Sequence, residues 1–121
     1  MASVKPLIFL SSLLVIFLTQ NSGGEVLKLW CIADSQMPAD VLQRAMDWAC
    51  EFGGANCTMT QEGQPCYLPN TLKDHASYAF NSYYQRFKSQ ADSCVFGSAA
   101  MVTETDPSHD SCIFERLPWS D

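Results

Sequence analysis

Six cysteines in a chain of 121 residues limit the possible folds more than any other feature of this sequence. They are spread over most of its length: Cys31, Cys50, Cys57, Cys66, Cys94 and Cys112. In a secreted chain of this size, an even number of cysteines predicts three disulfides. Zinc binding is the alternative use of cysteine, but no pair here has the C-x-x-C spacing common in zinc sites. We therefore expect a disulfide-stabilised domain with no metal and no cofactor.

The beginning of the chain predicts a secretory signal peptide over residues 1–24. One lysine precedes an apolar run from Leu7 to Leu18, and small polar residues follow. That run is shorter than the roughly 20 residues that a membrane-spanning helix needs, which disfavours the alternative of a retained anchor. We expect cleavage after Gly24, which would leave residues 25–121 as a single domain with its core at about residues 29–114.

The charge of the expected mature chain argues against several classes of partner. Cleavage would remove Lys5, one of seven basic side chains, and keep all 13 acidic ones, so the net charge would change from −6 to −7. Such a chain should repel nucleic acids, acidic pectins and anionic membranes, whereas its charge does not exclude neutral ligands. The polar ending "ERLPWSD" also lacks the hydrophobic tail of a lipid-anchor signal. We expect a protein released into the extracellular space.

Two stretches have the apolar spacing of helices. In residues 38–54, Trp48 and Phe52 fall within one broad apolar stripe, so we expect Trp48 in the core. A second helix is expected at about residues 72–89, where Thr71 is a good cap for its start. Its expected core face consists of Leu72, Ala76, Ala79, Phe80, Tyr83 and Phe87. With short strands in the remaining loops, these helices predict a small disulfide-rich α+β domain.

The second predicted helix also carries an aromatic ring on the side opposite its core face. Tyr78 points in that direction when each residue is turned by about 100°. An exposed tyrosine among amides and hydroxyls suits a pyranose, because the ring covers the C–H face of the sugar while neighbouring side chains bond its hydroxyls. The alternative is that a loop tied by the cysteines covers Tyr78. The candidate carbohydrate-binding residues on this helix are Tyr78, Tyr84, Asn81, Gln85 and Asp74.

The loop between the two predicted helices contributes two further candidates. Tyr67 could stack on a sugar, and its alternative is simple packing against the neighbouring Cys66. Asn56 begins an Asn-Cys-Thr acceptor sequence for N-glycosylation. The alternative there is an unused acceptor, because its middle residue is a cysteine expected to form a disulfide.

Five blocks of this sequence, in order, resemble the plant family 43 carbohydrate-binding module. They are "WCIAD", "LQRAMDWAC", "CYLPNTLKDHASYAFNSYYQ", "SCVFGSAA" and "DPSHDSC". The resemblance spans about residues 29–114 and includes all six cysteines. That family binds β-1,3-glucan, and it occurs in endo-β-1,3-glucanases, in callose-binding proteins at plasmodesmata and in stand-alone pollen allergens. The resemblance implies a secreted module that binds callose-type glucan in the plant cell wall without cleaving it.

The same resemblance implies a fold and a disulfide pairing. The family has two helices, a small antiparallel sheet and long loops tied by disulfides. Its pairing would join Cys31 with Cys94, Cys50 with Cys57, and Cys66 with Cys112; sequence reasoning alone leaves 15 connectivities open. The chain departs from the family at Val95, where an acidic residue is common, and at Ser98, where glycine is usual. Residues 115–121 have no counterpart in the family.

Two other functions compete with glucan binding. A glycosidase needs two carboxylates at a set separation, but most carboxylates here lie on predicted polar helix faces, where they are solvated. Neither His75 nor His109 has a nucleophile motif beside it. A cysteine-rich protein that recognises another protein, for instance in defence, would share the signal peptide and the disulfides. It would not require the aromatic face around Tyr78.

Overall fold

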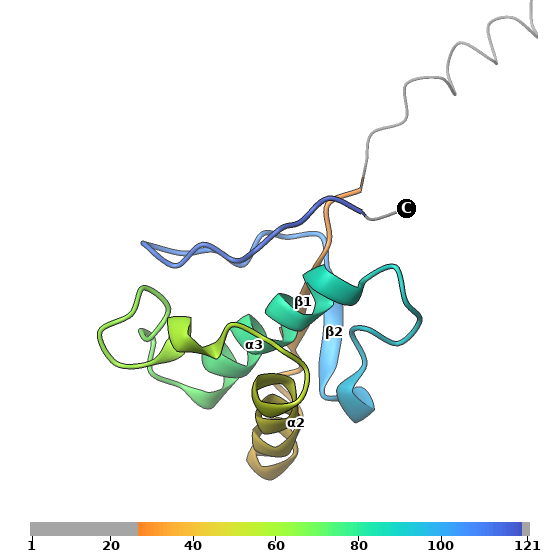
Figure 1. Ribbon diagram of the computed structural model, residues 1–121. Coiled ribbons are helices and arrows are strands. Elements are labelled where there is room, and N and C mark those ends of the chain that lie inside the picture. Colours follow the sequence, from red (N-terminus) through yellow and green to blue (C-terminus); the bar gives the residue numbers. More distant parts are fainter. Residues whose placement is uncertain (1–26, 120–121) are drawn as a thin grey trace, which may run out of the picture.

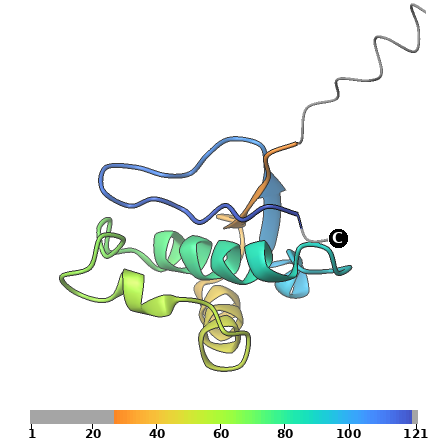
Figure 2. The same cartoon turned by 45° about the horizontal axis from the view of Figure 1, so that its top comes forward.

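Helix α3 (Leu72–Phe87) runs through the middle of the domain, with a helix on one side of it and a strand on the other (Figure 1). The computed structural model describes residues 27–119. The expected signal peptide at residues 1–24 therefore lies outside the described residues. Helix α2 (Ala39–Glu51) crosses α3 at a steep angle, as Figure 2 shows from a second direction.

A two-stranded antiparallel sheet packs on the other side of α3. Strand β1 (Trp30–Ala33) pairs with β2 (Ala100–Thr103) so that Cys31 lies opposite Val102. Two short 3-10 helices, η1 (Cys57–Thr60) and η2 (Phe96–Ser98), interrupt the long loops. This architecture confirms the predicted small α+β domain with two helices and an antiparallel sheet.

Local sequence signals explain where both helices begin and end. Thr71 caps α3 as predicted, since its hydroxyl oxygen accepts a hydrogen bond from the backbone N–H of Asp74 at 3.1 Å. Helix α2 starts directly after Pro38 and ends before Gly53, whose N–H bonds the Trp48 carbonyl at 3.0 Å. Among residues 27–119, no helix is both long enough and apolar enough to span a membrane.

Helix α3 is buried on two opposite sides, and this overturns the expectation of an exposed aromatic face. Phe80, on the predicted core face, is fully buried in the main apolar cluster between α2, α3 and β1. Tyr78 belongs to a second cluster, where Phe114 and the Cys66–Cys112 disulfide cover it. Only 3% of Tyr78 and 4% of Tyr84 is exposed. The predicted outward orientation of Tyr78 is therefore wrong, and Tyr84, another candidate binding residue, is buried as well.

Buried polar side chains of α3 bond the outer edge of strand β1. The N–H of Cys31 donates to Asn81 Oδ1 at 3.1 Å, and the N–H of Ala33 donates to Ser77 Oγ at 2.9 Å. Backbone groups buried without a partner are costly, so these bonds replace a missing third strand. The polar side of α3 thus stabilises the sheet.

The C-terminal segment, residues 114–119, completes the cover over α3. Asn81 Nδ2 donates to the Glu115 carbonyl at 2.8 Å, and the N–H of Leu117 donates to Gln85 Oε1 at 3.0 Å. Arg86 forms an ion pair with the Glu115 carboxylate at 2.7 Å. Residues beyond 114, to which the sequence assigned no role, therefore have a structural one.

All six cysteines form disulfides, with the pairing that the family resemblance implies: Cys31–Cys94, Cys50–Cys57 and Cys66–Cys112. They close segments of very different length, with sequence separations of 63, 7 and 46 residues. Because every cysteine is oxidised, none is available as a thiolate ligand for zinc. Within residues 27–119, no group of three or more His, Cys, Asp or Glu side chains could hold a metal ion.

A left-handed turn follows Cys94 and shapes the surface next to α2. Three consecutive residues have positive φ: Phe96 at 49°, Gly97 at 62° and Ser98 at 72°. Glycine tolerates this conformation and other residues do not favour it, which fits the glycine usual in the family where this chain has Ser98. The turn places the Phe96 ring against Phe80, with ring centroids 4.4 Å apart.

Candidate functional site

Four of the predicted binding residues lie inside the domain: Tyr78, Tyr84, Asn81 and Gln85. Tyr78 packs edge-on against Phe114, with ring centroids 5.2 Å apart. Burial raises the pKa of the Tyr78 hydroxyl, and the neighbouring Glu115 carboxylate raises it further. Burial alone raises the pKa of Tyr84. With strand β1 and the C-terminal segment over them, these side chains cannot receive a sugar in this conformation.

The fifth predicted helix residue, Asp74, is occupied at the start of α3. The carboxylate of Asp74 accepts a hydrogen bond from the Thr71 hydroxyl. The backbone N–H of Asp74 donates in turn to the oxygen of that hydroxyl at 3.1 Å. This reciprocal pair gives one of the unpaired backbone N–H groups at the start of the helix a hydrogen-bond partner. The structure therefore gives Asp74 a capping role, and Asp74 lines neither of the two grooves described next.

A groove in the surface lies between α2, α3 and the turn that contains Phe96. Its volume is about 480 Å³. Apolar and aromatic side chains form most of it, with one basic and one acidic side chain beside them. We call it the Trp48 groove, and its lining residues are Val41, Arg44, Ala45, Trp48, Tyr83, Asp92, Phe96 and Gly97.

Three aromatic rings meet edge to face in the Trp48 groove. The Trp48 ring lies 5.3 Å from Tyr83 and 6.1 Å from Phe96, and the latter two lie 5.4 Å apart, measured between centroids. Trp48 is 45% exposed. A Cβ added at Gly53 would come within 2.8 Å of the Tyr83 ring, so glycine allows this ring to sit close to the end of α2.

The exposure of Trp48 contradicts the prediction that it belongs to the core. Phe52, in the same predicted stripe, is 77% exposed. Helix α2 packs on α3 along a narrow line, so only Leu42 and Ala49 are fully enclosed. Tyr83, expected in the core of α3, is only half-buried because its ring reaches the groove. The broad apolar stripe of α2 is the signal in the sequence, and its edge, with Trp48 and Phe52, lies at the surface of the domain.

The Trp48 groove can bind a ligand that has both flat apolar faces and hydroxyl groups. Exposed aromatic rings cover C–H faces, and a few polar groups then fix the orientation. Arg44 supplies donors and its guanidinium lies 3.6 Å from the Asp40 carboxylate, while Asp92 supplies an acceptor. Asp92 is the only carboxylate among the described lining residues, whereas glycoside hydrolysis uses two facing carboxylates.

A second groove contains Tyr67, the remaining predicted binding residue. Its volume is about 430 Å³. It lies between the loop before α3 and a tight hairpin near the C-terminus, where His109 and Cys112 exchange backbone hydrogen bonds of 3.0 and 2.8 Å. We call it the Tyr67 groove, and its lining residues are Gly63, Gln64, Pro65, Tyr67, Leu68, Asp110 and Ser111.

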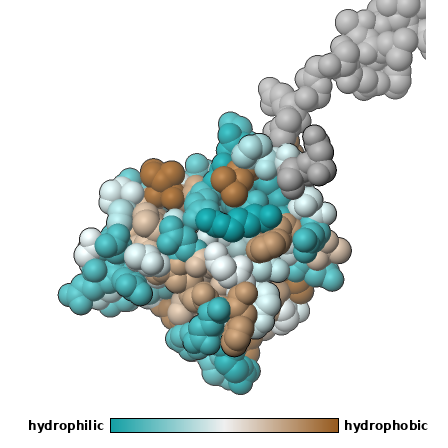
Figure 3. All heavy atoms as spheres, in the orientation of Figure 1, coloured by the Kyte–Doolittle hydropathy of each residue, from teal (hydrophilic) through white to brown (hydrophobic). Residues whose placement is uncertain are grey.

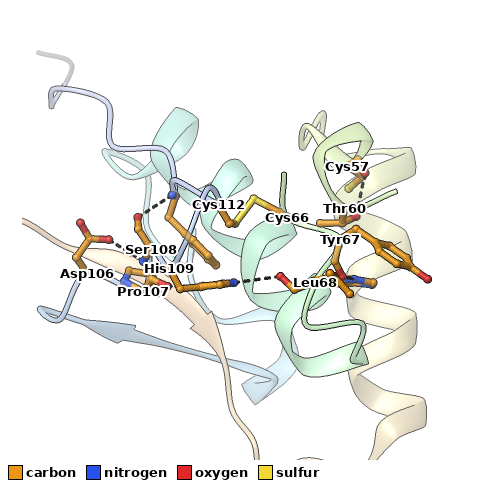
Figure 4. Close-up of a disulfide and its surroundings, with 12 residues drawn as sticks. Cys57, Thr60, Cys66, Tyr67, Leu68, Asp106, Pro107, Ser108, His109 and Cys112 are labelled. Carbon is orange, nitrogen blue, oxygen red and sulfur yellow. Dashed lines mark hydrogen bonds between the residues drawn. A yellow bond between two sulfur atoms is a disulfide. The ribbon is translucent and has the colours of Figure 1, made fainter. Parts of the chain in front are cut away.

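Two histidines hold the loop that forms one wall of the Tyr67 groove. His75 Nε2 lies 2.7 Å from the Tyr67 carbonyl. His109 Nε2 lies 3.3 Å from the Leu68 carbonyl, a contact that Figure 4 shows as a dashed line. The other ring nitrogen of His109, Nδ1, lies 3.1 Å from the Pro107 carbonyl. Both nitrogens of His109 thus face acceptors, and only the protonated imidazole can donate to both.

These contacts make the stability of the hairpin sensitive to pH. The hydrogen bond to Pro107 raises the pKa of His109 above its ordinary value of about 6.5, although partial burial opposes the rise. The Leu68 carbonyl, Asp74 from α3 and Asp110 from the hairpin raise it further. A raised pKa stabilises the fold fully below pH ~6.5, and this contribution is lost as the pH rises through the folded-state pKa.

Replacing His109 by asparagine should therefore cost more stability at pH 5.5 than at pH 8. Thermal unfolding of the wild type and the variant at both pH values measures this difference, and the His75→Asn variant serves as a control. An equal cost of His109→Asn at the two pH values would show that His109 is not protonated in its two hydrogen bonds.

The predicted glycosylation site lies on the surface. Asn56 is exposed, and its backbone N–H donates to Ser82 Oγ at 2.8 Å. Thr58, the third residue of the acceptor sequence, is exposed as well, while Cys57 between them is bonded to Cys50. Glycosylation of Asn56 stays a prediction, and a mass shift on glycosidase treatment of the secreted protein would test it.

Comparison with known proteins gives a family and a set of plant relatives. Residues 29–101 match the X8 domain. Glucan endo-1,3-beta-glucosidase 1 of Arabidopsis thaliana is 54% identical over 85 residues, which are 70% of this chain and 17% of that protein. Plasmodesmata callose-binding proteins 5 and 2 of the same plant are 36% and 33% identical over 84% and 87% of this chain.

These relatives are longer than this chain. The similarity covers less than a fifth of the glucosidase and 58% and 54% of the two callose-binding proteins. No solved structure gives a significant match.

Proposed function

The chain belongs to the X8 domain family, and from this premise we propose that it is a secreted, non-catalytic module that binds β-1,3-glucan of the plant cell wall. The relatives named as callose-binding proteins match most of this chain. The names of these relatives indicate the class of ligand, and the surface of this domain has a groove that can accept it. We assign the principal binding site to the Trp48 groove.

The observation that carries this assignment is the half-exposed Trp48 ring between Tyr83 and Phe96. A large ring that stays in contact with water costs free energy unless a ligand covers it. Its neighbours hold it at a fixed angle, so little conformational freedom is lost when a sugar stacks on it. A pyranose offers the matching flat C–H face.

The polar side chains of the groove suit a neutral polymer. Arg44 and Asp92 can bond hydroxyl groups as donor and acceptor. An anionic polysaccharide would instead meet Asp92 in the groove and the net negative charge of the whole chain, −6 at pH 7. Glucan, which carries no charge, avoids this repulsion.

Binding without cleavage fits both the relatives and the site. The callose-binding relatives are named for binding, and the likeness to a glucosidase is confined to 17% of that enzyme. The described lining of the Trp48 groove offers one carboxylate where hydrolysis would need two. Secretion is supported by the three disulfides, which persist in oxidising compartments.

Replacing Trp48 by alanine should weaken glucan binding by about 1 to 3 kcal/mol, or about 5- to 150-fold, as expected for an aromatic anchor. The purified domain is incubated with insoluble β-1,3-glucan, cellulose and chitin, and its depletion from the supernatant is measured. We expect selective depletion by the first polymer. Phe52→Ala is the matched control, because Phe52 is exposed directly after the last residue of the same helix but does not line the groove.

Three results would contradict parts of this proposal. Equal depletion of wild type and the Trp48 variant, with native circular dichroism in both, would remove Trp48 from the site. Depletion by none of the polymers would favour a cysteine-rich protein that recognises another protein. Release of reducing sugar would indicate hydrolysis.

A further inference from the structure

We propose that the Tyr67 groove is a second, independent binding site for a neutral glycan, so that one domain can hold two stretches of polysaccharide. This inference rests on the proposed function, because it takes the same class of ligand. It concerns a different set of residues, since the two grooves share no lining residue.

The Tyr67 side chain is a rigid and partly exposed platform. Its hydroxyl accepts a hydrogen bond from Asn70 Nδ2 at 2.9 Å, and its ring lies against His75 with centroids 5.8 Å apart. The bond between His75 and the Tyr67 carbonyl fixes the backbone of the same residue. Because the hydroxyl, the ring face and the backbone of Tyr67 are all held in place, the side chain loses little conformational entropy when a ligand stacks on it.

The two walls of the groove are joined covalently and by hydrogen bonds (Figure 4). The Cys66–Cys112 disulfide connects the residue before Tyr67 to the end of the hairpin. His109 links the same hairpin to the Leu68 carbonyl at 3.3 Å. A groove that is braced in this way keeps its shape in the absence of ligand, as most small-ligand sites do.

The chemistry of the lining selects a neutral, hydroxyl-rich ligand. Gln64 and Ser111 offer both donors and acceptors, and Asp110 offers an acceptor that would repel an anionic polymer. Leu68 is 68% exposed and adds apolar surface beside the Tyr67 ring. An aromatic ring, an apolar side chain and hydroxyl-bonding groups are the same combination that the Trp48 groove presents.

The two grooves lie toward opposite ends of α3. Figures 1 and 2 agree that the loop before α3 and the C-terminal hairpin are at one end of the domain, and that η2 is at the other. His75 and Tyr83, the α3 residues beside the two grooves, are eight positions apart, or about 12 Å along the helix. Occupation of one groove therefore leaves the other open.

Two sites on one domain have a measurable consequence for an insoluble polymer. Once one groove is occupied, the second meets neighbouring glucan at a high effective concentration, so retention exceeds that of either site alone. The domain can also connect two separate glucan particles. A protein with one site can do neither.

Titration of the isotope-labelled domain with a short β-1,3-linked gluco-oligosaccharide, followed by NMR, tests the inference directly. We expect two groups of backbone amides to shift, one around residues 41–48 and 92–97 and the other around residues 63–68 and 110–111. The Trp48→Ala variant should keep only the second group of shifts, and Tyr67→Ala only the first. Saturation of the first group without any shift in the second would overturn the inference, and this measurement requires only the wild-type protein.

Agglutination of β-1,3-glucan particles is the second readout. The wild type should agglutinate them, whereas each single-groove variant should bind more weakly, by on the order of 10-fold or more, and should not agglutinate. Tyr67→Phe keeps the ring and removes the hydroxyl with its bond to Asn70, so it separates the contribution of ring stacking from that of the hydroxyl. Agglutination by Tyr67→Ala at wild-type levels would count against the second site. Absence of any glucan binding by the wild type would instead reject the proposed function itself.

Discussion

Replacing Phe80 with alanine should lower the free energy of unfolding by about 3 to 5 kcal/mol. Phe80 is fully buried in the main apolar cluster, and its ring stacks on Phe96 at 4.4 Å. Removing it leaves a cavity between α3 and the turn after Cys94. Because Phe96 also lines the Trp48 groove, loss of its support should weaken glucan binding as well as stability.

Urea unfolding followed by circular dichroism measures the first effect, and Phe52→Ala provides the control. It removes the same side chain from a position that is 77% exposed, so stability should change by no more than about 0.5 kcal/mol. If Phe80→Ala cost no more than this control, the stacked pair of Phe80 and Phe96 would not be part of the core.

Removing the Cys31–Cys94 disulfide, with both cysteines changed to alanine, should cost about 4 kcal/mol in the chain-entropy model. This bond closes a sequence separation of 63 residues and attaches strand β1 to the start of the turn that contains Phe96. Domains of this size have only about 5 to 15 kcal/mol of stability. Removal of a native disulfide from a small secreted domain often abolishes folding at 37 °C, so we expect the variant to be largely unfolded at that temperature.

The Cys50–Cys57 disulfide is the internal comparison, because it closes a separation of only 7 residues. The same model gives about 2 kcal/mol for its removal, which the fold should tolerate. Thermal unfolding of the two double variants under the same conditions measures the difference. Equal destabilisation would show that strain or local packing, and not loop length, determines what each disulfide contributes.

The parts of the fold that local sequence determines could be predicted. The cap at Thr71, the buried row that includes Phe80, and the ending of α2 before Gly53 follow from spacing and from turn residues. The pairing of the cysteines required the family resemblance, because spacing leaves every connectivity open. Each of these features depends on residues close together in the chain or on a pattern shared by relatives.

The exposed aromatic face of α3 could not be judged from the helix alone. Periodicity shows which residues share a face, but it does not show what covers that face. The cover over Tyr78 comes from Phe114, 36 positions away, and Asn81 and Gln85 bond backbone groups that lie 34 and 56 positions away. Amides that bond peptide groups and amides that bond sugar hydroxyls look the same in a sequence.

For the Trp48 groove the error of periodicity is the reverse, because a face that it predicts to be buried is exposed. The apolar stripe of α2 indicated a buried face, and a stripe of that width usually lies in the core. Among residues 27–119, α3 is the one α-helix that packs against α2, and the enclosed part of α2 is limited to Leu42 and Ala49. The apolar stripe of α2 is wider than contact with one helix can cover. This excess width is the feature of the sequence that indicates a binding surface.

Gln85 brings together the first and last described segments, since its side chain bonds both the Leu29 carbonyl and the Leu117 N–H. Both segments leave the domain on the side of α3 that is away from α2 (Figure 1). The space-filling view from the same direction shows hydrophilic and hydrophobic residues interspersed over this face of the domain (Figure 3). A fluorescent label attached to either of these segments should thus leave Trp48 free, so that the proposed binding of glucan can be followed with the labelled domain.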